Sequence, residues 1–208
     1  ICLRSAETCN LSEVVLRPTD TVDDVSRKVR LATILGTIQS ALTDFRYVRP
    51  IWRKNAEEER LLGVSFTGVF DCPVVLNASP EQLTAWKDCA ISTNIEWAKK
   101  MKINPSAAIS CIKPSGTVSQ LTGVAGSGLH PSYAKYYIRR IRQDKKDPLN
   151  EALINAGIKH EEDPYNKEAI VFSFPMKAPA KSRTRHEFTA IEHLEIWKRF
   201  ALHWCEHK

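Results

Sequence analysis

Residues 106–121 combine the residue types that could hold a phosphate group. Small and β-branched residues at positions 106–112 predict a buried strand, and Pro114 then prevents that strand from continuing. Gly116 would let the backbone approach a ligand closely. Three hydroxyls surround the first turn of the helix predicted to follow, those of Ser115, Thr117 and Ser119. Unpaired N–H groups at a helix start favour an anion. Ser and Thr also cap helices that bind nothing, so the residues alone leave both interpretations open.

Cysteine and histidine supply the other candidates. Cys9 could be a redox thiol, which must be reachable by its partner, or a buried small apolar residue, the commoner state of an isolated cysteine. His130 lies in a Gly-rich connection, where a histidine facing water is the simpler interpretation than a base or a ligand. His203, Cys205 and His207 invite a zinc interpretation. Cys205 would point away from the two histidines on a helix and no second ligand cluster exists, so we expect no metal.

The amino-acid sequences of these segments resemble those of a known family. Residues 113–119, Lys-Pro-Ser-Gly-Thr-Val-Ser, resemble the substrate-phosphate loop of the adenosylcobalamin-dependent ribonucleotide reductases. Residues 9–14, Cys-Asn-Leu-Ser-Glu-Val, are similar to the family segment that carries one of two redox cysteines. Three further segments follow in the family's order, at 63–69, 171–175 and 203–207. The resemblance covers nearly the whole chain and points to the monomeric, triphosphate-reducing branch.

The resemblance implies a radical reaction on a ribonucleotide, a diphosphate or a triphosphate. In this family a radical derived from adenosylcobalamin forms a thiyl, the thiyl takes the 3′ hydrogen, the 2′-hydroxyl leaves as water, and a cysteine pair supplies the electrons. Cys9 would be one member of that pair, with its partner upstream of this chain, and a thioredoxin-like protein would be the final reductant. The substrate phosphates would be held by Pro114, Ser115, Gly116, Thr117, Val118 and Ser119.

The resemblance also implies the architecture, a ten-stranded α/β barrel made of two five-stranded halves. This chain would supply roughly the second half as a single segment, 1–208, incomplete at both ends. The thiyl cysteine, its glutamate and the effector loops would precede Ile1, and a further strand and the C-terminal reducing cysteines would follow Lys208. We therefore expect the chain to work only when docked to the other segments of the enzyme.

The elements that position these residues can be predicted from patterns. Thr21 caps a helix expected to reach about Tyr47, and Ser79 with Pro80 opens a second. Another helix is predicted over 147–156, and Thr189 caps one that runs to about Cys205. Strands are predicted over 61–70, 136–142 and 169–174, the last stopped by Pro175, with a polar connection over 54–60 and a turn at 72–73. The apolar face of the first helix is formed by Val25, Val29, Ala32, Leu35, Leu42 and Phe45. Alternating strands and helices favour an α/β fold with parallel strands.

Composition narrows the function classes. Of 208 residues, 43% are hydrophobic and 26% charged, which allows a substantial core, and no apolar run is long enough to cross a membrane. Six cysteines without a CxxC motif favour a reducing cytoplasm. The net charge of +6 is spread along the chain and suits polyphosphate only weakly. The alternative is a non-catalytic α/β domain that binds phosphate or nucleic acid. The basic and aromatic run at 136–142 is short and has no second patch, so we expect no nucleic-acid partner.

Overall fold

The computed structural model describes residues 2–124 and 126–206, which form two compact units. The first unit comprises Ile1–Tyr133 and Pro179–Lys208, and the second comprises Ala134–Ala178. Within the described residues, no helix combines the length and the hydropathy needed to cross a membrane.

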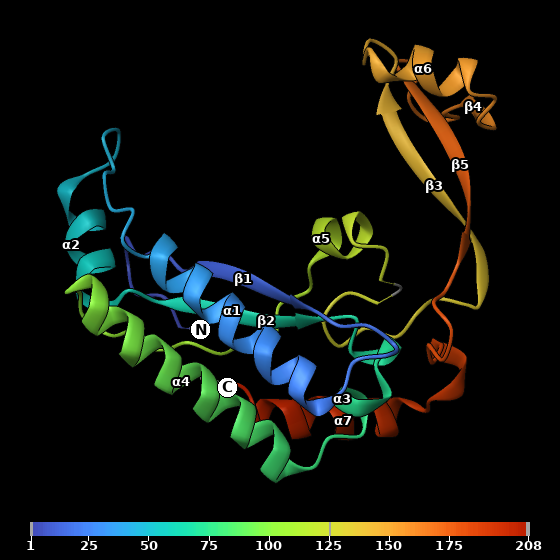
Figure 1. The fold of residues 1–208 in the computed structure, drawn as a ribbon. Coiled ribbons are helices and arrows are strands. Elements are labelled where there is room, and N and C mark those ends of the chain that lie inside the picture. The colour runs from blue at the N-terminus through green and yellow to red at the C-terminus, as the bar shows by residue number, and fades with distance from the viewer. Residues whose placement is uncertain (1, 125, 207–208) are drawn as a thin grey trace. The chain divides into compact units, whose positions relative to one another are not determined.

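A small parallel sheet lies at the centre of the first unit (Figure 1). Strand β1 (Asn10–Val15) pairs in parallel with β2 (Leu62–Thr67), with Asn10 opposite Leu62. On the other side of β2 runs the extended segment 108–111, whose Cys111 N–H donates to the Val64 carbonyl at 3.0 Å. All six residues of β2 are buried because the strand has neighbours on both sides and packing on both faces.

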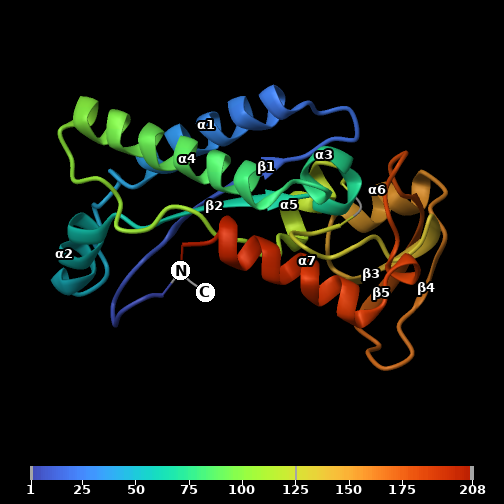
Figure 2. The same cartoon turned by 90° about the horizontal axis from the view of Figure 1, so that it is seen from below.

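Three helices cover one face of this sheet (Figures 1 and 2), α1 (Val22–Gln39), α4 (Pro80–Met101) and α7 (Ala190–His203). Phe66 of β2 points into the core between them, and its ring contacts the rings of three aromatic residues: Trp86, Phe200 and Trp204. The predicted helix starts are confirmed. Thr21 and Thr189 each form a reciprocal capping box, and the Ser79 hydroxyl accepts a hydrogen bond from the Gln82 N–H.

The residues after α7 hold the free side of the 108–111 segment. The Glu206 carboxylate accepts hydrogen bonds from the N–H groups of Ile109 and Ser110. The Trp204 indole N–H donates to the Cys111 carbonyl at 2.8 Å, and the Ser110 hydroxyl donates to the Trp204 carbonyl at 2.6 Å. Backbone groups that an edge segment would leave unpaired are thus partly satisfied by the chain itself.

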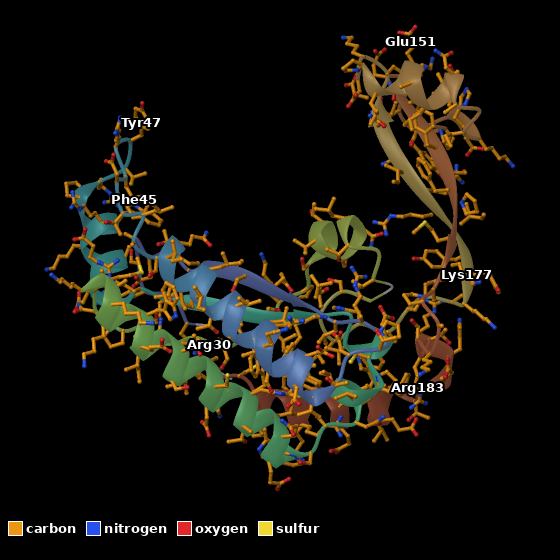
Figure 3. All side chains as sticks on the ribbon, in the orientation of Figure 1. Arg30, Phe45, Tyr47, Glu151, Lys177 and Arg183 are labelled. Carbon is orange, nitrogen blue, oxygen red and sulfur yellow. The ribbon has the colours of Figure 1, made fainter. Side chains whose placement is uncertain are left out.

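Helix α1 ends eight residues earlier than the predicted limit of Tyr47. Ser40 caps it, and the chain then turns, so Phe45 and Tyr47 lie on the connection to α2 (Figure 3). Leu35 and Leu42, predicted as core residues, are 64% and 72% exposed. The prediction was wrong because the core lies on the side of α1 marked by Val25, Val29, Ala32 and Gly36. Leu31, Leu35 and Ile38 form a second apolar stripe on another side of α1, and Leu42 follows the helix; the sequence pattern merged these residues with the core face.

Three other predictions near β2 need correction. Residues 54–60, predicted as a connection, belong mostly to α2 (Pro50–Glu59), where Pro50 occupies the first helical turn. The strand predicted over 61–70 ends at Thr67, because Gly68 has a φ of 83° and opens the 3-10 turn η1 (Val69–Asp71). Pro73 starts the short helix α3 (Pro73–Leu76) instead of a simple turn.

The second unit is an antiparallel sheet in the order β3-β5-β4. It consists of β3 (Tyr136–Asp144), β4 (His160–Glu162) and β5 (Ala169–Lys177), with α6 (Leu149–Asn155) after β3. The expectation of parallel strands is therefore wrong here, although it is confirmed for β1 and β2. Pro175 does not stop β5. It sits opposite Ile138 where β4 no longer pairs, so its missing N–H removes no bond to that strand.

The α/β class is thus confirmed, whereas the ten-stranded barrel stays a prediction. The segment predicted as a strand over 106–112 is extended but forms only one isolated bridge, between Ser110 and Val64. The last two short elements are α5 (Gly116–Leu121) and the 3-10 turn η2 (Arg185–Glu187).

Candidate active site

The sheet face turned away from the helical core carries the candidate residues. Side chains alternate between the two faces of a strand. In β1 the buried Val14 belongs to the helical core and Ser12 faces Gly36 of α1, so the other set, Leu11 and Glu13, points to the opposite face. Cys9, directly before β1, continues this second set. The sequence pattern thus places a thiol and a carboxyl on one strand face.

Gly63 of β2 provides the space into which two thiols project. A Cβ atom at Gly63 would lie 3.2 Å from the Cys9 sulfur, 3.2 Å from the Cys111 sulfur, and would overlap Leu11. The sulfurs are therefore neighbours across a position without a side chain. Their backbones lie on opposite sides of β2, two strand spacings or about 9.6 Å apart. A disulfide needs Cα atoms within roughly 7 Å, so this geometry disfavours a bond between Cys9 and Cys111.

Burial keeps these thiols protonated. Burial raises the pKa of the half-buried Cys9 thiol, and the nearby Lys113 ammonium opposes that shift. The more deeply buried Cys111 has a pKa raised to about 12, first by burial and then by the proximity of Cys9 and Cys205. A thiol that stays protonated is a poor metal ligand or nucleophile. Among the residues described here, no three His, Cys, Asp or Glu side chains gather as metal ligands, and His207 lies outside them.

The predicted phosphate loop follows the 108–111 segment and leads into α5. Ser65 of β2 fixes its start, because the Lys113 N–H donates to the Ser65 hydroxyl at 2.9 Å. Pro114, Gly116 and Thr117 are exposed, Val118 is partly exposed, and Ser115 and Ser119 are buried. The Ser115 hydroxyl makes no capping bond to α5, and a Cβ at Gly116 would meet nothing within 4 Å. The loop is therefore open at Gly116, where the sequence predicted a close approach.

Glu13 shares the strand face of Cys9 and also lies near this loop. Its carboxyl faces the hydroxyls of Ser115 and Ser65 and lies near Lys113. Burial raises its pKa to about 7, against the opposing influence of Lys113 and of the two hydroxyls. The Oε2 atom is buried and has no hydrogen-bond partner among the described residues. In the sequence, Glu13 stands out only as part of the segment 9–14 that resembles the family. The signal that could have found it is the alternation from Cys9 through Leu11 to Glu13.

A cavity of about 460 Å³ is lined by α7 and by the chain from Cys111 into the predicted loop, including Pro114. Its walls are mostly apolar, contain two thiols and two imidazoles, and do not include the loop hydroxyls. The residues that line it include Cys111, His130, His193, Trp197 and Cys205. His130 is exposed, and one of its ring nitrogens lies 2.9 Å from the Ser127 carbonyl, so it belongs to the loop as predicted and is tied to that loop's backbone.

Sequence comparison relates the chain to one group of enzymes. No protein family model matches it. The adenosylcobalamin-dependent ribonucleoside-triphosphate reductase of Lactobacillus acidophilus is 29% identical over 206 residues, which cover 86% of this chain and 27% of the relative. The enzyme of the same name from Euglena gracilis is 29% identical over 221 residues, covering 99% of this chain and 28% of the relative. The chain spans little more than a quarter of the length of these curated relatives.

Structural comparison agrees with this relationship. The fold is similar to that in the crystal structure of a B12-dependent (class II) ribonucleotide reductase, with a TM-score of 0.79. The match covers the whole of this chain and 33% of the other, at 22% sequence identity, and so bears on the fold. The chain is therefore similar in sequence to one segment of the adenosylcobalamin-dependent ribonucleoside-triphosphate reductases, and similar in fold to part of a class II ribonucleotide reductase.

Proposed function

We propose that this chain is a catalytic segment of an adenosylcobalamin-dependent ribonucleotide reductase. In this proposal residues 114–119 bind the substrate phosphates and Cys9 is one of the two cysteines that reduce the ribose. The observation that carries it is the convergence of Cys9, Glu13 and the loop on one polar sheet face whose opposite side is a closed aromatic core. The names of the relatives favour a ribonucleoside triphosphate as the substrate.

The redox step needs two thiols. Two S–H groups give two electrons and two protons, the 2′-hydroxyl leaves as water, and a disulfide forms between the two sulfurs. Cys9 is half-buried and protonated, as a hydrogen donor must be. The strand spacing disfavours Cys111 as its partner, which supports a partner on another segment of the enzyme. A thioredoxin-like protein would then reduce the disulfide by thiol exchange.

Adenosylcobalamin would supply the radical that starts the reaction. The cavity of about 460 Å³ is in the range of pockets for drug-sized ligands, roughly 300–1,000 Å³. A corrinoid with its adenosyl group is much larger than such a ligand. The described residues therefore do not form a cobalamin site by themselves, and we assign the cofactor to the assembled enzyme.

Exposed apolar surfaces support docking to other segments. Leu31, Leu35 and Ile38 make a second side of α1 apolar, away from its core face, and the exposed Leu42 follows the helix. A helix that is apolar on two sides is normally covered on both. In α7, Leu194 and Trp197 are 62% and 56% exposed. The parts of the relatives that this chain does not match would offer surfaces to cover these side chains.

Changing the loop tests this assignment in the assembled enzyme. Ser115→Ala removes one hydroxyl from the phosphate site, so we expect the KM for the ribonucleotide to rise about tenfold with little change in kcat, as for a contact made equally in ground and transition states. The matched control is Thr84→Ala, because Thr84 lies on α4, away from the loop, and its hydroxyl donates to the Pro80 carbonyl. Steady-state kinetics with both variants measure the effect. An unchanged KM for Ser115→Ala would show that the loop does not bind the substrate phosphates.

A further inference from the structure

Glu13 has an environment that is unusual for a carboxyl. It lies on β1, on the same face as Cys9, and its Oε2 atom is buried without a hydrogen-bond partner among the described residues. An unpartnered buried oxygen normally costs free energy of folding. Such an atom is better explained when a ligand or a proton completes its bonding.

The groups around Glu13 indicate what kind of ligand could bond to its Oε2 atom. Lys113 supplies a positive charge near the carboxyl, and Ser65 and Ser115 supply hydroxyls. The Cys111 thiol also lies near the carboxyl, and the Cys9 thiol shares its strand face. Burial raises the pKa of both thiols, so neither carries a charge at neutral pH. An anion in the loop would share Lys113 with Glu13. It would therefore compete with the ionised carboxylate and favour its protonated form.

We propose that Glu13 is a proton-dependent binding residue, which in its uncharged form donates a hydrogen bond from Oε2 to a phosphate held at residues 113–119. The proposal rests on the proposed function of that loop. It assigns to β1 a contact with the substrate's anionic group in addition to the redox role of Cys9. Phosphate binding then takes up one proton.

The direction of the pH effect follows from this linkage. Burial already raises the pKa of Glu13 to about 7, so the carboxyl is partly protonated at neutral pH. Above that value the group ionises and repels the anion, and the affinity falls by about tenfold per pH unit. Glutamine at this position keeps an N–H donor and cannot ionise. Glu13→Gln should therefore keep the affinity and lose this part of the pH dependence, whereas Glu13→Ala should bind more weakly at every pH.

The test is calorimetric titration of the full chain with inorganic tripolyphosphate between pH 5.5 and 8.5. The ratio of the wild-type affinity to that of Glu13→Gln cancels the titration of the ligand itself. We expect this ratio to fall about tenfold per pH unit above pH 7. Glu195→Gln on the exposed side of α7 removes one carboxylate as a control and should show the wild-type curve. Circular dichroism confirms that each variant is folded.

Two results would overturn the proposal, and they differ in what they say about the loop. Parallel plots of tripolyphosphate affinity against pH for wild type and Glu13→Gln would exclude Glu13 from phosphate binding. They would leave the loop as a phosphate site. No tripolyphosphate binding by the folded wild-type chain would contradict the loop assignment, and the Glu13 proposal with it. A second measurement is independent of affinity: the carbon NMR signal of the Glu13 carboxyl should titrate at a higher pH when tripolyphosphate is present. An unchanged midpoint with ligand bound would also contradict the proposal.

Discussion

Cys9→Ser is expected to abolish multiple turnover by the assembled reductase while nucleotide binding and folding remain. A serine hydroxyl has the shape of the thiol but cannot form the disulfide that provides two electrons to the ribose. Because the proposed Cys9 pair is the source of those electrons, the rate should fall to the background of the assay. The measurement is deoxyribonucleotide formed per enzyme over many turnovers, with a chemical or protein reductant in excess.

Cys89→Ser is the matched control. Cys89 is also a half-buried free cysteine, but it lies on α4, outside the group formed by Cys9, Glu13 and the loop. Its replacement should change the rate by no more than about twofold, as for a substitution away from any special contact. Wild-type turnover by Cys9→Ser would show that the redox pair lies elsewhere.

Trp204→Ala should cause the largest loss of stability among single changes in the first unit. Trp204 is fully buried, and its ring lies 4.3 Å from the ring of Phe66 between centroids. Truncating a buried tryptophan costs about 3–5 kcal/mol of unfolding free energy. The change also removes the donor to the Cys111 carbonyl. Loss of that bond should loosen the 108–111 segment that leads to the loop.

Urea unfolding followed by circular dichroism measures this effect. Trp197→Ala provides the control, since Trp197 lies on α7 and is 56% exposed. It should lose less than about 1 kcal/mol. Trp204→Phe, which keeps an aromatic ring and removes the N–H, should fall between the two. Equal unfolding midpoints for Trp204→Ala and Trp197→Ala would contradict the packing described for the core.

Local signals predicted the helix starts well and the ends less well. Thr21, Ser79 and Thr189 cap helices because their hydroxyls accept nearby N–H groups, an interaction complete within four residues. The end of α1 at Gln39 has no such signal, and the apolar stripe continues past it to Leu42. A stripe shows that a face is apolar, but the tertiary structure decides which face is covered.

Strand direction was predicted correctly for β1 and β2 but not for β3 and β5. β1 and β2 are joined through α1 and α2 and run parallel. β3 and β5 have similar sequence patterns but pair as antiparallel neighbours, and the ion pair of Arg140 with Glu161 connects β3 with β4, which flank β5. A short helix and the small strand β4 lie between them, and nothing in the apolar pattern distinguishes this connection from a crossover.

The candidate site, too, was predicted only in part from the sequence. Cys9 and residues 113–119 were found through the resemblance, whereas the structure adds Glu13, Ser65 and Gly63. The contribution of Gly63 depends on two cysteines that are 102 positions apart in the chain and meet only across β2. Ser65 acts by bonding the Lys113 backbone, 48 positions away. A strand's alternation tells which residues share a face, but only the packed sheet tells what that face meets.

Reconstitution tests whether this chain is one segment of a reductase. The chain should be assayed for deoxyribonucleotide formation alone, and after co-expression with the segments that flank it in its relatives, in both cases with adenosylcobalamin and dithiothreitol. We expect no turnover by the chain alone, and turnover together with a stable complex in size-exclusion chromatography when the segments are present. Robust turnover by the chain alone would contradict this account. A complete assembly without turnover, combined with oligonucleotide binding that weakens steeply with salt, would contradict it in favour of a nucleic-acid-binding domain.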